Sequence, residues 1–283
     1  MDDYSKGPIT QRRHKTIRRI VRPLALPILD EIAFRKHISL IPELGFRFRP
    51  APGAPKSMGN GTFELAERRV LGEALTWADY FINVGANSGY FTLQALAANV
   101  PTSAVEPDRR NLDFLLRNVV ANGWSTNVEV LPVALSDETG VVSIFGGGTG
   151  ASLIPGWAGA TQSRLVPAST LDRMYASRAL GERILMMIDV EGAEYKCLSG
   201  GREFFRLNPN MMVLMEVGFS AHHPDGYNPN VLETFALMHE MGFAAFAISD
   251  ELEHLRLVDI EAITAHKMPP RNQNFVFRRG DIP

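Results

Sequence analysis

The sequence lacks several features that would mark it as a membrane, secreted or nucleic-acid-binding protein. It has one cysteine, Cys197, which excludes an intramolecular disulfide and a metal site built from cysteines. No apolar run approaches the ~18 residues of a membrane-spanning helix, and no apolar signal core follows the amino terminus. The formal net charge of −2 gives no reason to expect a nucleic-acid partner. We therefore expect a cytoplasmic protein in which Cys197 is a buried structural thiol.

Basic residues are crowded into the first 22 residues, where only Asp2 and Asp3 oppose them. They are Lys6, Arg12, Arg13, Lys15, Arg18, Arg19 and Arg22. A solvated tail is the interpretation that we favour, and weak contact with an anionic membrane surface is the alternative. Prolines then recur up to residue 55 and break any long helix. We therefore divide the chain into a basic and then proline-rich N-terminal extension, residues 1–60, and a larger domain, residues 61–283.

From residue 61 onward the pattern predicts alternating helices and strands. Two near-continuous apolar runs, 184–190 and 211–217, are typical of central strands in a parallel sheet. The other strands are expected at 80–85, 102–106, 127–133, 243–248 and 274–278, with helices at 63–76, 88–98, 108–122, 170–180, 192–206 and 230–241. Asp108 is a suitable N-cap for its helix. Seven strands alternating with helices predict a three-layer α/β/α sandwich.

Two regions fall outside this alternation. A short helix is expected around residues 28–37. Short strands at 141–145 and 164–167 flank a glycine-rich loop, 146–159, which contains Trp157. Long loops of this kind beside a site often act as lids. We expect this one either to close over an acceptor or to be a surface insertion.

The most informative segment begins at Phe81 and reads FINVGANSGYFTLQALAANVPTSAVEP. It predicts a strand, a glycine turn, a helix and a second strand that ends at Glu106. Gly85 and Gly89 would allow a sharp turn and a close approach of a ligand, and free N–H groups at the helix start would form a polar cradle. Glu106 lies 21 residues after Gly85 and would reach ribose hydroxyls. This unit is typical of nucleotide or nucleoside binding.

The glycine spacing distinguishes between such ligands. A dinucleotide site would need G-x-G-x-x-G, whereas this turn reads G-x-N-x-G and continues with Tyr90 and Phe91. No Lys or Arg occurs between Phe81 and Arg109 to meet a phosphate. A ligand with a ribose but no phosphate fits better, so we expect S-adenosyl-L-methionine as the cofactor. The alternative is a glycine turn in an ordinary α/β sheet.

Acidic residues end the two central strands. Asp189 and Glu191 follow the first, and Glu216 ends the second, with His222 close behind. Because ligands of open α/β sheets bind beyond the carboxyl ends of the strands, these residues should share a rim with the glycine turn. Such a rim suits proton removal from a hydroxyl, hydrogen bonding to a polyol, or a divalent cation with oxygen ligands. We predict no metal site, and a divalent metal stays an alternative.

Two neighbouring features have simpler explanations. Glu194 lies at a helix start, where acids are favourable, so we expect it to cap or salt-bridge that start. For His222 and His223, a place in a surface loop is as well supported as a role in the site.

Six segments in order resemble the FkbM family of S-adenosylmethionine-dependent methyltransferases. They are FINVGANSGYFT, AVEPDRRNLDFLLRNVVANG, VALSDETG, STLD, MMIDVEGAEYKCLSGG and LMEV, and they cover about residues 62–217. The resemblance implies the class I methyltransferase (Rossmann-like) fold, with a seven-stranded, mostly parallel sheet whose last strand is antiparallel. Residues 61–283 would then be the catalytic domain. It also implies O-methylation of a hydroxyl on a sugar, a polyketide or another secondary metabolite.

The resemblance also implies which residues form the site. Cofactor binding would fall to Asn83, Gly85, Ala86, Asn87, Gly89, Tyr90, Glu106, Pro107, Asn111, Ala134 and Asp189. Asn83 departs from the family, which usually has Asp there, and this predicts a weaker hold on the methionine ammonium. For proton removal we rank Asp189 first, followed by Glu191, Glu216 and His222.

Two rival functions stay open at this point. The acidic rim could orient an amine, which would make the protein an N-methyltransferase. Asn83 and the basic tail are compatible with a non-catalytic protein that binds S-adenosylmethionine and a partner. The expected partner is a small-molecule or carbohydrate acceptor, and a homo-oligomer stays open.

Overall fold

The computed structural model describes residues 30–220, 222–249, 252–267, 270 and 272–280. The chain divides into two compact units, Met1–Ser39 and Leu40–Pro283. In the first unit, residues 30–37 are helical, as the sequence predicts. The basic segment 1–22, and with it the expected membrane contact, lies outside the described residues. The site and its supporting fold lie in the second unit.

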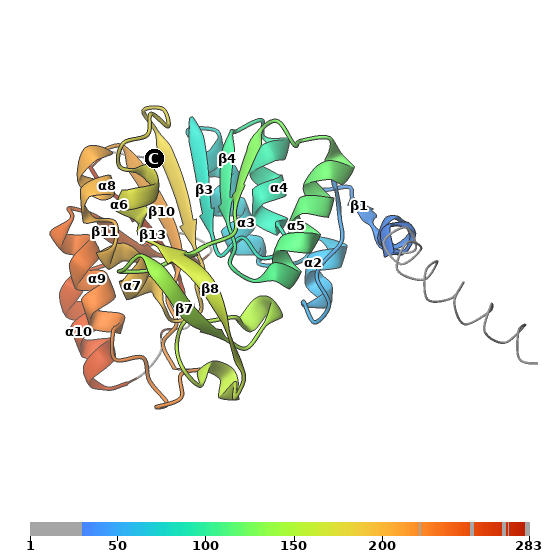
Figure 1. Cartoon of the computed structure of the whole chain (residues 1–283). Coiled ribbons are helices and arrows are strands. Elements are labelled where there is room, and N and C mark those ends of the chain that lie inside the picture. Colours follow the sequence, from blue (N-terminus) through green and yellow to red (C-terminus); the bar gives the residue numbers. More distant parts are fainter. Residues whose placement is uncertain (1–29, 221, 250–251, 268–269, 271, 281–283) are drawn as a thin grey trace, which may run out of the picture. The chain divides into compact units, whose positions relative to one another are not determined.

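An eight-stranded sheet forms the centre of the second unit, counted over the described residues (Figure 1). In sheet order the strands are β12 (Glu253–Leu255), β11 (Ala244–Ala247), β13 (Asn274–Arg278), β10 (Met211–Glu216), β9 (Ile184–Ile188), β3 (Tyr80–Val84), β4 (Thr102–Val105) and β5 (Val128–Leu131). The strands from β10 to β5 are parallel, and β13 runs antiparallel between β10 and β11. This is the predicted class I methyltransferase sheet. The prediction of seven strands misses β12, a short strand that adds an edge beside β11.

Helices cover both faces of this sheet, which confirms the three-layer sandwich (Figure 1). One face carries α3 (Leu65–Leu75), α4 (Tyr90–Ala97) and α5 (Arg109–Asn122), and the other carries α6 (Leu171–Tyr175), α7 (Glu194–Ser199), α8 (Arg202–Leu207), α9 (Val231–Glu240) and α10 (Leu257–Ala265). Successive side chains of a strand point to opposite faces. Accordingly Met186 packs in one core with Phe204, and Leu185 packs in the other with Leu71. Cys197 is fully buried in the first core, as predicted.

Two helix predictions are wrong in their extent. The helix expected at 192–206 is broken into α7 and α8 at Gly200 and Gly201. A Cβ at Gly200 would overlap the Ser136 carbonyl oxygen, and one at Gly201 would lie 2.7 Å from a Leu171 methyl group. The break therefore lets two backbone segments approach closely. The helix expected at 170–180 ends at Tyr175, where the Arg178 N–H donates to the Tyr175 carbonyl and turns the chain.

Residues 40–60 contribute to the core of the second unit. They contain β2 (Phe46–Phe48), α2 (Lys56–Asn60) and the end of β1 (Ser39–Ile41). Ile41, Phe46, Phe48 and Met58 are buried in the same core as Leu71. The sequence gives no periodic signal for this packing because prolines interrupt the segment.

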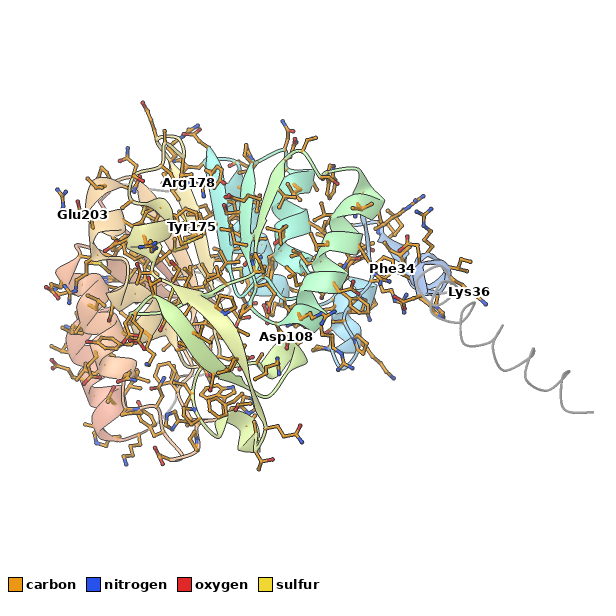
Figure 2. All side chains as sticks on the ribbon, in the orientation of Figure 1. Phe34, Lys36, Asp108, Tyr175, Arg178 and Glu203 are labelled. Atoms are coloured by element: carbon orange, nitrogen blue, oxygen red, sulfur yellow. The ribbon has the colours of Figure 1, made fainter. Side chains whose placement is uncertain are left out.

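A separate three-stranded sheet carries the glycine-rich loop. It consists of β6 (Ala134–Leu135), β8 (Ser163–Ser169) and β7 (Gly140–Phe145), in that order. The strands predicted at 141–145 and 164–167 are confirmed within β7 and β8. Asp108, at the start of α5 (Figure 2), pairs with Arg164 of β8, whose guanidinium also donates to the Gly146 carbonyl. This ion pair anchors the small sheet beside the carboxyl edge of the main sheet.

Candidate functional site

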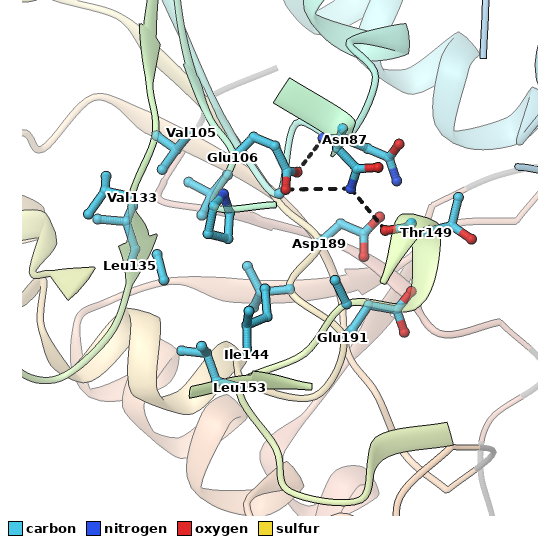
Figure 3. Close-up of a pocket in the computed structure, with 18 residues that line it drawn as sticks. Asn87, Val105, Glu106, Val133, Leu135, Ile144, Thr149, Leu153, Asp189 and Glu191 are labelled. Atoms are coloured by element: carbon cyan, nitrogen blue, oxygen red, sulfur yellow. Dashed lines mark hydrogen bonds between the residues drawn. The ribbon is translucent and has the colours of Figure 1, made fainter. Parts of the chain in front are cut away.

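A pocket of about 550 Å³, including its open mouth, lies at the carboxyl ends of β3, β4 and β9 (Figure 3). Its wall contains these residues expected to bind a cofactor: Gly85, Asn87, Glu106, Pro107, Asn111, Ala134 and Asp189. The parallel strands bring them together from distant parts of the sequence, because their carboxyl ends meet at one rim.

Gly85 allows two strand ends to touch at the floor of this pocket. Its φ is +81°, a left-handed conformation that favours glycine. A Cβ there would overlap the carbonyl oxygen of Asp189. The Asp189 N–H in turn donates to the Val84 carbonyl at 3.0 Å. The turn after β3 and the end of β9 are therefore pressed together with no room for a side chain at position 85.

Glu106 is a fixed hydrogen-bond acceptor at the end of β4. Its carboxylate accepts the backbone N–H groups of Asn87 and Asp108, each at 2.7 Å. The Asn111 amide lies 3.5 Å from the same carboxylate and donates to the Gly148 carbonyl at 2.9 Å (Figure 3). Burial raises the pKa of Glu106 to about 7, against the opposing effect of these hydrogen bonds. The geometry suits a carboxylate that accepts hydrogen bonds from the hydroxyls of a ribose.

The pocket is apolar at one end and polar at the other (Figure 3). Val133, Leu135, Ile144 and Leu153 form the apolar end. Asn87, Thr149, Asp189 and Glu191 form the polar end. This division fits S-adenosylmethionine, which has an adenine base at one end, a charged amino acid at the other and a ribose between them.

Several residues expected to bind the cofactor do not line the pocket. Asn83 is 3% exposed and donates from Nδ2 to the Thr92 hydroxyl at 2.9 Å. Ala86 packs in a small core, Gly89 begins α4 with φ +95°, and Tyr90 is buried among phenylalanine rings. They shape the turn and the helix behind the pocket. Their contact with the cofactor stays a prediction, and a motif of consecutive residues includes side chains that face away from the pocket.

The small sheet and its loop supply pocket residues that the sequence does not reveal. Ile144, Gly148, Thr149, Ala151 and Leu153 all line the pocket. They come from β7 and from the glycine-rich loop, which we expected beside an acceptor and not beside the cofactor. Glycine-rich loops have no side-chain periodicity from which their position could be derived.

The acidic residues at the strand ends lie close enough to alter one another's ionisation. Burial raises the pKa of Asp189 well above its ordinary value, and the charges of Glu191, Glu194 and Glu106 add to the effect. Burial, followed by the charge of Glu216, raises the pKa of Glu191 to about 7. For Glu216 the charge of Asp189 is the largest cause, and the pKa rises to about 8.

Glu64 and Glu67, which sequence analysis does not single out, belong to the same cluster. They lie at the start of α3, outside the six segments that resemble the family. Burial raises the pKa of Glu64 to about 9, and the charges of Asp189, Glu216, Glu67 and Glu191 contribute. Glu67 is 7% exposed. The sequence signal is ambiguous here, because acids are common in the first turn of any helix.

A second, smaller cavity adjoins the first. It measures about 280 Å³ and is lined by Trp157, Glu191, Glu194, Glu216, Gly218, Phe219, His222 and Gln273. Glu191 borders both cavities, whereas Asp189 borders only the first, and Glu216 and His222 only the second. Glu194 accepts the N–H groups of Gly192 at 2.7 Å and Gly218 at 3.5 Å. The expected helix cap is therefore not observed, because Ala193 is the N-cap of α7 and no side chain caps that helix. Glu194 instead joins the segments after β9 and β10, and it borders the second cavity.

The described residues give no sign of a metal centre or a membrane span. Across these residues, no group of three or more His, Cys, Asp and Glu side chains is arranged to hold a metal ion. No helix within the described ranges is long and apolar enough to cross a membrane.

Comparison with known proteins identifies a matching family. A family model named "Methyltransferase FkbM domain" matches residues 83–245, more than half of the chain. No curated protein sequence matches the chain.

Several solved structures are similar to this chain at low sequence identity. A SAM-dependent methyltransferase from Agrobacterium tumefaciens is 14% identical, with a TM-score of 0.45 and coverage of 85% of this chain and 69% of that one. Precorrin-6y C5,15-methyltransferase from Geobacter metallireducens is 11% identical, with a TM-score of 0.42 and coverage of 85% and 96%. Cofactor-bound Rv0187 from MTB is 11% identical, with a TM-score of 0.42 and coverage of 98% and 100%.

Proposed function

The chain belongs to the FkbM family of S-adenosylmethionine-dependent methyltransferases, and from that premise we propose that it methylates a hydroxyl oxygen of a small acceptor. The acceptor that we propose is a sugar, a polyketide or another hydroxylated metabolite without a negative charge. The observation that carries the proposal is the position of Glu191, which borders both the cofactor pocket and the second cavity.

We assign the cofactor to the larger pocket. The carboxylate of Glu106 would accept the ribose hydroxyls, and the apolar wall that includes Leu135 and Ile144 would cover the adenine. Asn87 and Asp189 would meet the amino-acid end. When bound, S-adenosylmethionine supplies an activated methyl group on a sulfonium, so the protein mainly has to align the acceptor and exclude water.

Glu191 is the best candidate for the group that removes the proton from the acceptor. A general base works best when its pKa lies near the operating pH, and the pKa of Glu191 is about 7. Asp189, which the sequence ranks first, borders only the cofactor pocket, and burial keeps its pKa well above its ordinary value. Glu216 and His222 border only the second cavity. We therefore rank Glu191 ahead of Asp189.

The second cavity is the proposed acceptor site, and its charge restricts what it accepts. Its wall includes the carboxyl groups of Glu191, Glu194 and Glu216, and none of the described residues that line it is Lys or Arg. A phosphate or carboxylate on the acceptor would find no Lys or Arg partner there and would oppose the ionisation of Glu191. A neutral polyol could be hydrogen-bonded by the carboxyl groups and by Gln273, with Phe219 as an apolar surface.

The same carboxyl groups support a second candidate, N-methylation of an amine. Carboxylates attract ammonium groups, and Glu191 could accept a proton from an ammonium as well as from a hydroxyl. The two candidates differ in the atom that carries the new methyl group.

The test uses S-adenosylmethionine labelled with ¹³C in the methyl group and a panel of acceptors. The panel pairs neutral polyols and glycosides with their phosphorylated forms, and includes matched amines. NMR then identifies whether each methyl group is bonded to oxygen or nitrogen. We expect O-methyl products from neutral acceptors only. Products from amines alone, or equal transfer to phosphorylated acceptors, would contradict the proposal.

Glu191→Gln tests the assignment of the base within the same assay. Loss of a general base reduces turnover by about 10²–10⁴-fold, so we expect a decrease in this range with cofactor affinity little changed. Glu138→Gln is the matched control, since Glu138 is exposed in the turn before β7. Full turnover by Glu191→Gln would remove Glu191 from the mechanism.

A further inference from the structure

The glycine-rich loop contacts Glu191 at two points. The Ser152 hydroxyl donates to the Glu191 backbone carbonyl at 2.6 Å. The Trp157 indole N–H donates to the Glu191 carboxylate at 3.0 Å. Ser152 is 1% exposed and Trp157 is 2% exposed. One loop therefore binds both the backbone and the side chain of the residue that separates the two cavities.

Trp157 lies in a space that two glycines leave open. A Cβ at Gly192 would overlap the indole ring, and one at Gly218 would lie 2.8 Å from its Cη2 atom. These glycines follow β9 and β10, so the indole packs against the ends of both central strands. The loop is also bound on its far side, because the Ala158 N–H donates to the His222 carbonyl at 2.7 Å. The His222 ring lies 5.9 Å from the indole, centroid to centroid.

Glu191 needs such support because its backbone is strained. Its φ is +54°, a left-handed conformation that few residues other than glycine adopt. Conformations of this kind persist only where the surroundings impose them, and they concentrate at functional sites. The bond from Ser152 fixes the strained peptide, and the bond from Trp157 fixes the carboxylate.

We propose that Trp157 is a positioning residue, which acts with Ser152 to hold Glu191 between the cofactor pocket and the acceptor cavity. The contacts that hold the loop against Glu191 then also align the carboxylate that accepts the proton. The role of Glu191 rests on the proposed function, whereas the interaction between the loop and Glu191 is a property of the protein alone. The two can therefore be tested separately.

The hydrogen bond between Trp157 and Glu191 can be measured through its effect on the pKa of Glu191. The hydrogen bond from Trp157 lowers the pKa of Glu191, while burial and the charge of Glu216 raise it. The other titratable groups that face Glu191 are Asp189 after the end of β9, Glu64 from the start of α3, and Glu194 and His222 in the acceptor cavity. Because the indole donor is the group that lowers the pKa of Glu191, its loss should raise that pKa further.

The first test is a pH titration of the indole N–H signals in the ¹⁵N NMR spectrum of the full chain. The chain has three tryptophans, and Trp157→Phe identifies the signal of Trp157. We expect that signal to titrate with a midpoint near 7, where Glu191 ionises. Glu191→Gln should abolish the titration, and the signals of Trp77 and Trp124 are internal controls. A Trp157 signal that does not titrate, or that titrates equally in Glu191→Gln, would overturn the proposal.

The second test separates positioning from a merely structural role. With an accepted substrate, Trp157→Phe should lower kcat at least ~10-fold, a part of the ~10²–10⁴-fold that a general base contributes, and should shift the pH midpoint of kcat upward. Its affinity for S-adenosylmethionine should stay within about threefold of the unmodified chain, a change below ~0.7 kcal/mol. Ser152→Ala, which leaves the indole bond intact, should lower kcat with a smaller shift in the midpoint. Trp124→Phe is the matched control.

An unchanged pH profile in Trp157→Phe would overturn the positioning role even if kcat falls. The proposed function fails in a different way. If the unmodified chain does not bind S-adenosylmethionine while the Trp157 signal still titrates with Glu191, the interaction stands and the methyltransferase assignment of the pocket is wrong.

Discussion

At the scale of single residues, Gly85 offers the sharpest test of the cofactor pocket. Gly85→Ala would place a Cβ against the Asp189 carbonyl, whereas Gly123→Ala would meet no atom within 4 Å. The φ angles are +81° and +75°, so both variants place alanine in a left-handed backbone conformation. That conformation costs about 1–2 kcal/mol for alanine.

We therefore expect Gly123→Ala to lower the free energy of unfolding by about that amount and to keep its affinity for S-adenosylmethionine. Gly85→Ala should be less stable still and should bind the cofactor at least ~10-fold more weakly, which corresponds to 1.4 kcal/mol. Urea unfolding and calorimetric titration measure the two quantities. Equal behaviour of the two variants would mean that the close approach to Asp189 is unimportant.

The role of a residue could be predicted where it depends on residues close to it in the sequence. Asp108 is the N-cap of α5, and its side chain accepts the Arg110 N–H at 2.7 Å, as its type and position predict. Glu106 lies in the pocket because the second strand ends there. The direction of the Tyr90 side chain could not be predicted, because at the start of α4 it depends on the packing of Phe48 and Phe63 around it.

At the scale of elements, the anchor between the two sheets should control the loop. Arg164 of β8 bonds both Asp108 at the start of α5 and the Gly146 carbonyl at the start of the loop. Arg164→Met keeps much of the aliphatic stem but removes both bonds. Hydrogen exchange in residues 146–159 should then be faster, and S-adenosylmethionine should bind more weakly because Thr149 and Leu153 line its pocket.

The matched control for that variant is Arg173→Met on the surface of α6, which should leave exchange in the loop unchanged. If Arg164→Met also leaves exchange unchanged, the ion pair does not hold the loop.

Helices and strands could be predicted where burial alone determines the pattern of apolar residues. β9 and β10 read as central strands because both of their faces are buried. The division between α7 and α8 coincides with the adjacent pair Gly200 and Gly201, which is a local signal for a break. The close approach to Ser136 and Leu171 that explains the pair depends on the fold and could not be predicted. β12 and α10 were missed because both lie at the edge of the sheet, where exposed positions weaken the apolar periodicity.

At the scale of the whole molecule, the buried acids should make the cofactor-free protein less stable as pH rises. Their pKa values are raised to about 7 for Glu106 and Glu191, about 8 for Glu194 and Glu216, and about 9 for Glu64. The ordinary value is 4.5. Between pH 4.5 and these raised pKa values, the folded protein binds more protons than the unfolded chain. The buried acids therefore stabilise the folded protein fully below pH 4.5, and this stabilisation is lost as the pH rises through the raised pKa values.

We therefore expect the free energy of unfolding to decrease from about pH 5 to pH 9, measured by urea unfolding at fixed ionic strength. Glu64→Gln should reduce the slope over this whole range, and most clearly near its alkaline end, where the acids with lower pKa values have already ionised. A stability that rises with pH over this range would mean that these groups are not held protonated.

The most direct test of the cofactor pocket is a calorimetric titration with S-adenosylmethionine at pH 7, in two buffers that differ in ionisation enthalpy. The cofactor carries a sulfonium and an ammonium, so its binding should favour the ionised acids and release protons. S-adenosylhomocysteine, which lacks the sulfonium charge, should release fewer. We predict micromolar binding of S-adenosylmethionine and no binding of NAD. Glu106→Gln should bind S-adenosylmethionine at least ~10-fold more weakly than Glu138→Gln, since a hydrogen bond to a charged acceptor contributes about 1.5–3 kcal/mol. No binding of S-adenosylmethionine, or equal binding of NAD, would contradict the account.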